Sequence, residues 1–282
     1  MLFERAICWA SAAAASLIFV PCNADAQPDW MKKFQARSTH YTAQQPRWPG
    51  PVFVSTPQLV QVLREDFAHQ ESGSTHLWNI GVGKGLQFVP LPRTEFTFAI
   101  PSHLRRVDEE PDGFGDFNCA VKYRLLGAPE KKGNYILSAQ LGAAVPTGND
   151  SNNSADAAVI PQLMGGKGWG RFDQSAAVLA TLPVHNAGRN GHVFTAHTAS
   201  QFHATKYVWP AIETTTTHWI GGRRDGQVQF LMGPSVIVGR LPYTRHEKDR
   251  RRGISLGAGY QVAVTHTHNV NHVFQITTRL HF

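Results

Sequence analysis

Residues 272–282 read HVFQITTRLHF, and they decide the fold class. One face of this stretch collects apolar or small side chains and the other collects polar ones: Phe274, Ile276, Thr278, Leu280 and Phe282 against Gln275, Thr277, Arg279 and His281. Successive side chains of a β-strand point to opposite faces, so this alternation predicts a strand with one apolar and one polar face.

The same alternation recurs in residues 117–125, 135–145 and 254–264. These stretches approach the roughly 10 residues that a tilted transmembrane strand needs, whereas ordinary soluble strands have about 5 to 6. A soluble β-sandwich would show the same alternation with its apolar face turned inward. Strand length therefore favours a membrane barrel, and the sandwich is the alternative.

The whole chain after residue 57 divides into alternating segments separated by turn-rich stretches, which predicts an all-β, transmembrane, antiparallel up-and-down β-barrel of about 12 strands. Poor alternation in residues 156–167 and 191–219 leaves 10 or 14 strands as alternatives. The predicted strands are 58–69, 76–89, 93–101, 114–126, 134–146, 156–167, 171–183, 191–203, 206–219, 227–239, 253–265 and 271–282.

Three regions are expected along the chain. Residues 1–26 read as a secretory signal peptide, with Arg5 before an apolar run and a small-residue cleavage site at its end. Residues 27–57 are rich in proline and lack periodicity, which predicts an irregular periplasmic lead-in. Residues 58–282 form the predicted barrel. An exported barrel is expected in the outer membrane of a Gram-negative cell.

The last strand also carries a candidate assembly signal. A final strand that ends on an aromatic residue, with apolar residues at alternate positions before it, resembles the C-terminal signal of outer-membrane proteins. The residues concerned are Phe274, Ile276, Leu280 and Phe282. The barrel assembly machinery is therefore an expected partner.

Charged side chains on the predicted strands are expected to face the lumen. An Arg or Lys that faced lipid at mid-membrane would cost roughly 2 to 4 kcal/mol. These side chains either neutralise one another in a filled interior or form a polar constriction that favours anions. The candidates for lumen and selectivity residues are Arg93, Glu95, Asp116, Lys122, Arg124, Glu213 and Arg279.

The formal net charge is +7, but the basic residues are scattered along the chain. This pattern argues against nucleic acid and is compatible with lipopolysaccharide or other anionic outer-membrane lipids as partners. His266, His268 and His272 suggest a metal site, yet no carboxylate or cysteine lies near them in sequence, so no metal or other cofactor is expected. His197 and Ser200 would lie on opposite faces of a strand, which argues against a catalytic pair.

The central strands resemble a known family. The strings Asp112-Gly113-Phe114-Gly115-Asp116, Val121-Lys122-Tyr123-Arg124-Leu125, Gly133-Asn134-Tyr135 and Val145-Pro146-Thr147-Gly148 are similar to the outer-membrane transporter family of the MetA pathway of phenol degradation. Trp209-Pro210 and Met232-Gly233-Pro234 fit later parts of that pattern. The resemblance implies a barrel for passage of small, often aromatic or hydrophobic, compounds, with Asp116 as a family residue.

These observations lead to a functional hypothesis. We expect a passive outer-membrane channel or transporter for a small-molecule solute, without enzymatic chemistry. The runner-up is a non-conducting barrel that acts as an anchor or adhesin, in which residues 27–57 could plug the lumen. A lipid-modifying barrel enzyme is the third alternative. An interior of about 12 strands lies between the filled barrels of about 8 strands and the open ones of 16 or more.

Overall fold

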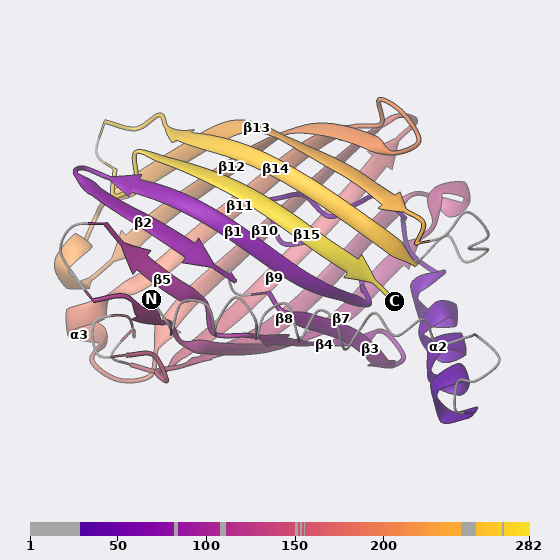
Figure 1. Ribbon diagram of the computed structural model, residues 1–282, viewed down its shortest axis with the longest axis horizontal. Coiled ribbons are helices and arrows are strands. Elements are labelled where there is room, and N and C mark those ends of the chain that lie inside the picture. The colour runs from indigo at the N-terminus through magenta and orange to yellow at the C-terminus, as the bar shows by residue number, and fades with distance from the viewer. Residues whose placement is uncertain are drawn as a thin grey trace, which may run out of the picture. The chain divides into compact units, whose positions relative to one another are not determined.

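The structure is a computed structural model that describes residues 29–81, 84–107, 111–149, 152, 154, 156–243, 252–266 and 268–282 (Figure 1). The predicted signal peptide lies outside the described residues. The chain divides into two compact units, Met1–Arg37 and Ser38–Phe282. In the described ranges, no helix has the length and apolar character needed to cross a membrane.

Helix α2 spans Asp29–Thr42. It contains neither glycine nor proline. Asp29 in its first turn and His40 in its last turn interact favourably with the helix dipole and so stabilise the helix. The prediction of an irregular lead-in is therefore wrong for these residues. The prolines that suggested it lie before the helix, at Pro28, and after it, from Pro46 onward.

A single antiparallel sheet contains 15 β-segments and closes on itself, because β1 pairs with β15 as well as with β2. Short helices lie in three of the connections: η2 (Glu130–Lys132), α3 (Ala187–Asn190) and η3 (Gly222–Arg224). The β-segments are β1 (Val62–Ser72), β2 (Thr75–Ile80), β3 (Leu86–Leu91), β4 (Thr94–Ala99), β5 (His103–Arg106), β6 (Gly113–Phe114), β7 (Phe117–Ala128), β8 (Tyr135–Val145), β9 (Ala158–Trp169), β10 (Phe172–Pro183), β11 (His192–Phe202), β12 (Val208–Ile220), β13 (Val228–Leu241), β14 (Gly253–Ala263) and β15 (His272–His281).

These segments make a closed barrel of 12 strands, which confirms the predicted fold class and strand number. The pairs β2 and β3, β4 and β5, and β6 and β7 are each two parts of one barrel strand, separated by a short break. The first strand begins at Val62 and not at the predicted residue 58. Residues 58–60 belong instead to a segment inside the barrel.

The break between β2 and β3 lies in a glycine-rich stretch of the sequence. Strand β1 continues past it, because Gly81 N donates to Asp66 O at 2.7 Å and Arg64 N donates to Gly85 O at 2.9 Å. A Cβ on Gly85 would lie 2.3 Å from Phe98 O, and the φ of Gly85 is +33°. Glycine is therefore required where β3 resumes its pairing with β4.

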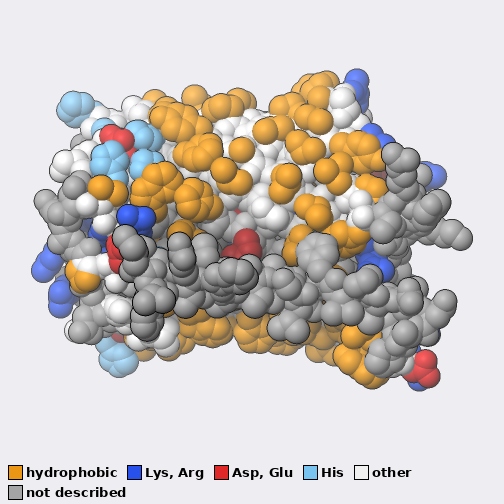
Figure 2. All heavy atoms as spheres, viewed as in Figure 1, with side chains coloured by type: hydrophobic (Ala, Val, Ile, Leu, Met, Phe, Trp, Pro, Cys, Tyr) orange, Lys and Arg blue, Asp and Glu red, His pale blue; other side chains and the backbone are white. Residues whose placement is uncertain are grey.

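The outer face of the barrel carries a belt of exposed apolar side chains, seen in orange in Figure 2. Leu141 is 58% exposed and Val178 is 54% exposed, although both lie in the middle of regular strands. A continuous apolar surface of this kind is unfavourable in water and favourable in lipid. With the closed fold, it places the barrel in the outer membrane of a Gram-negative cell.

The two ends of the barrel differ in their connections. The first residue of β1, Val62, is paired with the last residue of β15, His281, so the sheet begins and finishes at the same end of the barrel. Outer-membrane barrels keep their termini and short turns in the periplasm, so the hairpin β1–β2 and the connections after β5, β8, β10, β12 and β14 are at the external end. The connection between the predicted strands 227–239 and 253–265 falls largely on residues outside the described ranges.

The register predicts which positions a lipid-soluble reagent reaches. In a Cys119→Ser background, a cysteine at Val121, which is 42% exposed, should react with a lipid-soluble maleimide in folded protein. A cysteine at Ser138, which is 0% exposed, should be protected. Mass spectrometry of vesicle-reconstituted protein measures both yields. Labelling of the Ser138 position and not of the Val121 position would show that the two faces are inverted.

Candidate functional site

Residues 45–60 lie inside the barrel, and we call them the lumen segment. The segment has no regular secondary structure, yet the side chains of Trp48, Val52, Val54 and Leu59 are at most 2% exposed. Buried backbone N–H and C=O groups need hydrogen-bond partners, and without a strand or helix these must come from elsewhere. Polar side chains on the inner face of the barrel supply them.

Glu213 of β12 binds the middle of the lumen segment and is 0% exposed. Its Oε1 accepts from Val52 N at 2.8 Å, and its Oε2 accepts from Phe53 N at 2.8 Å and from Val54 N at 3.0 Å. Ser235 of β13 donates to the same carboxylate. Hydrogen bonds to an ionised acceptor are stronger than neutral ones, so Glu213 is the principal anchor of this part of the segment.

Two arginines bind the carbonyl groups next to this anchor. Arg279 of β15 donates to the carbonyl oxygens of Gly50 and Pro51. Arg64 of β1 donates to Val52 O at 2.7 Å, and its Nε donates to both carboxylate oxygens of Asp66, at 2.7 and 2.9 Å. The wall thus presents donors to the carbonyls of one part of the segment and an acceptor to the amides of the next.

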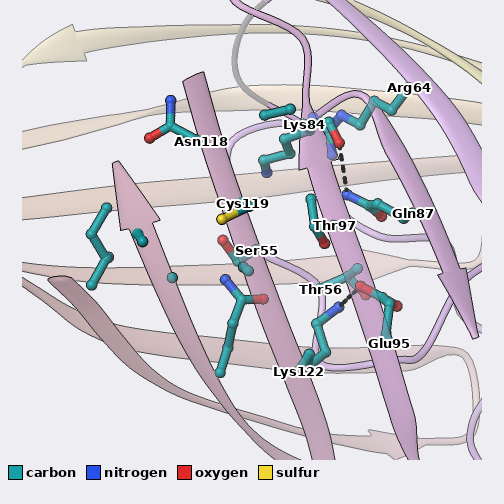
Figure 3. Close-up of a pocket in the computed structure, with 16 residues that line it drawn as sticks. Ser55, Thr56, Arg64, Lys84, Gln87, Glu95, Thr97, Asn118, Cys119 and Lys122 are labelled. Atoms are coloured by element: carbon teal, nitrogen blue, oxygen red, sulfur yellow. Dashed lines mark hydrogen bonds and ion pairs between the residues drawn. The ribbon is translucent and has the colours of Figure 1, made fainter. Parts of the chain in front are cut away.

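A second anchor holds the end of the lumen segment that leads into β1. Glu95 of β4 and Lys122 of β7 are cross-strand partners, and their Oε1 and Nζ are 2.7 Å apart. Lys122 also donates to Gln58 O at 3.1 Å, and the other oxygen of Glu95 accepts from Val60 N at 2.6 Å. The ion pair therefore binds one carbonyl and one amide of the segment while its own charges remain paired (Figure 3).

The lumen segment is also closed on itself. Gln45 Nε2 donates to Leu59 O at 2.7 Å, and Leu59 N donates to Gln45 Oε1 at 3.0 Å. Arg124 of β7 donates to the same amide oxygen at 3.2 Å and to Tyr41 O at 2.8 Å. These bonds join the two ends of the segment into a loop and attach that loop to the wall.

Glycines in the wall leave room for the aromatic side chains of the lumen segment. A Cβ on Gly166 of β9 would lie 2.7 Å from the indole ring of Trp48, and a Cβ on Gly259 of β14 would lie 2.6 Å from the ring of Phe53. The Trp48 Nε1 donates to Asn134 Oδ1 at 2.9 Å. Gly166 and Gly168 thus both face inward in the regular strand β9, and both leave space for Trp48.

Apolar side chains of the wall pack against Val54. This residue packs in a buried cluster with Met164 of β9, Ala177 of β10 and Ala199 of β11. All four are at most 2% exposed. The interior of the barrel is therefore not uniformly polar, because apolar contacts fix the lumen segment between its charged anchors.

A cavity of about 310 Å³ remains between the lumen segment and the wall. Ser55 and Thr56 of the segment border it, and Figure 3 shows Lys84, Gln87 and Thr97 around it. Asn118, Gln140 and Gly142 of the neighbouring strands β7 and β8 complete part of its lining. Its surface combines hydrogen-bonding groups with small apolar ones, so it can accommodate a small solute with a polar end.

Five of the residues predicted to face the lumen do so and contact the lumen segment or residues next to it: Glu95, Lys122, Arg124, Glu213 and Arg279. Arg93 does not, because it lies exposed in the turn between β3 and β4 with a φ of +58°. Asp116 lies between β6 and β7 and accepts from Gly148 N at 3.1 Å and Ser154 N at 2.8 Å. It therefore fixes the external connection after β8 and does not line the polar interior.

Three further charged residues of the interior were not predicted from the sequence: Arg64, Asp66 and Lys84. Arg64 and Asp66 lie on the inner face of β1, and Glu65 between them is exposed on the outer face. Because all three residues are charged, the sequence shows no alternation of polar and apolar residues there. Lys84 lies within the glycine-rich break between β2 and β3 and borders the cavity. The proline content of residues 46–57 was a usable signal, since proline disfavours sheet pairing and leaves carbonyl groups for the wall to bind.

The predicted assembly residues lie on the outer face of β15 or directly after it. The inward positions of this strand are buried, whereas Phe274, Ile276 and Leu280 are half-buried or exposed, as is Phe282. His197 and Ser200 face opposite sides, as expected: His197 Nδ1 lies 3.1 Å from Thr215 Oγ1, and Ser200 contacts Gln174. In the part of the chain that the structure describes, no group of three or more His, Cys, Asp or Glu side chains is placed to hold a metal ion.

Comparisons with known proteins show a likeness in structure. No protein-family model and no curated protein sequence matches the chain. The COG4313 outer membrane channel from Pseudomonas putida F1 aligns with a TM-score of 0.56 and 14% identity, over 84% of this chain and 100% of that chain. The translocator domain of the autotransporter NalP from Neisseria meningitidis aligns with a TM-score of 0.42 and 10% identity, over 97% of both chains. The first likeness shows a shared barrel fold.

Loss of the Glu213 charge should loosen the middle of the lumen segment. Replacement by glutamine removes the anionic acceptor of the amides of Val52, Phe53 and Val54, and a bond to a charged group contributes about 1.5 to 3 kcal/mol. Hydrogen exchange at these amides should accelerate by about 30-fold, which corresponds to roughly 2 kcal/mol. Glu71→Gln, on the outer face, is the matched control. Equal exchange rates in both variants would contradict this role of Glu213.

A methyl group at residue 166 should conflict with Trp48, whereas one at residue 165 should not. In Gly166→Ala the new Cβ would lie 2.7 Å from Trp48, and in Gly165→Ala it would lie 3.4 Å from Leu137. Overpacking costs about 1 to 3 kcal/mol, so the free energy of unfolding should fall by that amount in the first variant alone. Urea titration of vesicle-reconstituted protein measures it. A larger loss in Gly165→Ala would show that Trp48 is not seated against β9.

Proposed function

We propose that this protein is a passive outer-membrane channel for small molecules, in which the lumen segment acts as the gate. The observation that carries the proposal is the way the segment is held. It crosses a polar interior, bound by side chains such as Glu213 and Arg279 and not by strand pairing, and a cavity of about 310 Å³ lies beside it. A segment attached through side-chain contacts can move without any change in the 12-stranded wall.

The charges of the wall are suited to both states of such a gate. With the segment in place, Arg64 is paired with Asp66 and Lys122 is paired with Glu95. When the segment leaves, Arg279 and Glu213 lose their backbone partners and become available to water and solute. Passage then requires no covalent chemistry and no cofactor, because hydration of these groups replaces the contacts that are lost.

The class of solute is a separate part of the proposal. The resemblance of residues 112–148 to the MetA-pathway family supports small aromatic or hydrophobic compounds, and one solved structure that shares the barrel fold is that of an outer membrane channel. The cavity lining supports a solute that also carries a polar group, since Thr97, Asn118 and Gln140 lie beside Ala99 and Ile160. A phenol or an aromatic acid has this combination of groups.

A non-conducting barrel is the second candidate, and the lumen segment itself favours it. Its contacts with Glu213, Arg279, Lys122 and Ser138 are numerous enough to hold the segment in place permanently. Such a protein would serve as an anchor or adhesin through its external loops. The two candidates differ in whether the segment is ever displaced under native conditions.

Single-channel recording in planar bilayers separates the two candidates. We expect discrete openings from the wild-type protein, blocked by aromatic acids, and more frequent openings from Glu213→Gln. A variant that lacks residues 45–57 should be open continuously, and Glu71→Gln should behave as the wild type. A silent wild type with an open deletion variant would establish the plugged barrel. A silent deletion variant that is correctly folded would contradict the channel.

A further inference from the structure

A cluster of histidines lies on the outer face of the barrel, at the external edge of the apolar belt, and the proposed channel does not use it. His69 of β1 stacks against His76 of β2, with ring centroids 5.6 Å apart, and its centroid is 6.4 Å from that of His272 of β15. Trp78 lies against His69 at 4.2 Å. Figure 2 shows pale-blue histidine side chains beside the orange belt, in the area where Figure 1 places the β1–β2 hairpin.

The orientation of the cluster follows from the sheet register. His69 is paired with Phe274 and Trp78, and His272 is paired with Val262, which is 40% exposed in the belt. Paired residues in neighbouring strands face the same side, so these histidines face outward. They lie where the strands meet the external loops, which is the level of the headgroups of the outer leaflet.

Among the residues that the structure describes, few other charges face the cluster. The Oε2 atom of Glu71, on β1, lies 3.1 Å from His272 Nε2 and 3.8 Å from His76 Nδ1. Arg105 of β5 is the cross-strand partner of Trp78 and is exposed. From β14, Tyr260 contacts His272 at a centroid distance of 5.6 Å. With neutral histidines, Glu71 and Arg105 balance each other, whereas protonated histidines make the patch strongly positive.

More histidines continue along the same edge of the barrel. His103 of β5 is paired with Phe114, His192 of β11 with Ile220, and His218 of β12 with Val228. The partners are exposed members of the apolar belt, so these three histidines also face outward. The edge therefore carries titratable groups on several sides of the barrel, with the densest group at His69, His76 and His272.

We propose that the cluster of His69, His76 and His272, together with Arg105, binds the phosphate groups of the anionic glycolipid in the outer leaflet, and binds them more tightly as the pH falls. Two features select this occupant. The patch is continuous with a surface that faces lipid, so its ligand must be a headgroup with an attached acyl region. Protonation of its histidines in acid makes the patch positive, which complements phosphate.

A fall in pH makes the lipid less negative while it makes the protein patch more positive, so the two contributions to binding can be distinguished. A phosphate monoester loses part of its negative charge near pH 6, so protonation of the lipid alone would weaken binding. Tighter binding at low pH must therefore come from the protein. Removal of the responsible histidines should abolish the tightening, and can reverse the sign of the pH effect.

The experiment measures binding of fluorescent diphosphorylated lipid A to the full-length refolded protein in detergent micelles, at about pH 7.5 and about pH 5.5. Wild type should bind roughly tenfold more tightly at the lower pH, because each added surface charge strengthens the attraction to anionic lipid. The combined variant His69→Gln, His76→Gln and His272→Gln should show no tightening. The control is His185→Gln, His266→Gln and His268→Gln, which replaces external loop histidines, and it should behave as wild type.

A second probe identifies the phosphate. Lipid A without phosphate groups should bind the wild type equally at both pH values. Tightening that persists with this probe, or in the combined variant, would overturn the proposal. Resistance of each variant to unfolding in cold detergent, read from its gel mobility before and after heating, shows that the barrel is folded. The result is independent of ion conduction, so it stands apart from the channel proposal.

Discussion

The constraint on which this structure depends is that a polar group removed from water must find a partner within the protein. In the wall, the pairing of β1 with β15 meets that constraint by closing the sheet, so that the first and last strands are hydrogen-bonded to each other. In the interior, the charged side chains meet it by binding one another and the main chain of residues 45–60. The buried carboxylate of Glu213 and the amides of Val52 to Val54 each remove the other's cost of burial.

The barrel could be predicted from the sequence because alternation is a local property. Within each strand, the polarity of a side chain indicates whether it faces lipid or the interior. Val121 is apolar and 42% exposed, whereas the next residue, Lys122, is charged and 3% exposed. Positions beyond the regular strands were less predictable. Arg93 continues the alternation of β4 in sequence but lies in the turn, and Asp116 lies in a break where the two faces are not defined.

The lumen segment could be only partly predicted, for a physical reason. Its structure depends on partners far away in the sequence, such as Glu213, which is 161 residues from Val52, and Arg279, which is 229 residues from Gly50. No periodicity within residues 45–60 records those contacts. The prolines indicated that the segment does not pair as a strand, and the strand number of about 12 left a plugged barrel as an alternative. The position of the segment inside the barrel could be determined only from the structure.

Most anchors of the lumen segment contact main-chain atoms. Glu213 binds amides, while Arg279, Arg64 and Ser138 bind carbonyls, and every amino acid has a carbonyl. Recognition of this kind is nearly blind to side-chain identity. The segment can therefore diverge in sequence while it keeps its place, provided that its length, its path past the wall glycines and the amides that face Glu213 are retained. Among related barrels, an occupied interior would then be recognisable from the wall residues even where the occupying peptide has no detectable similarity.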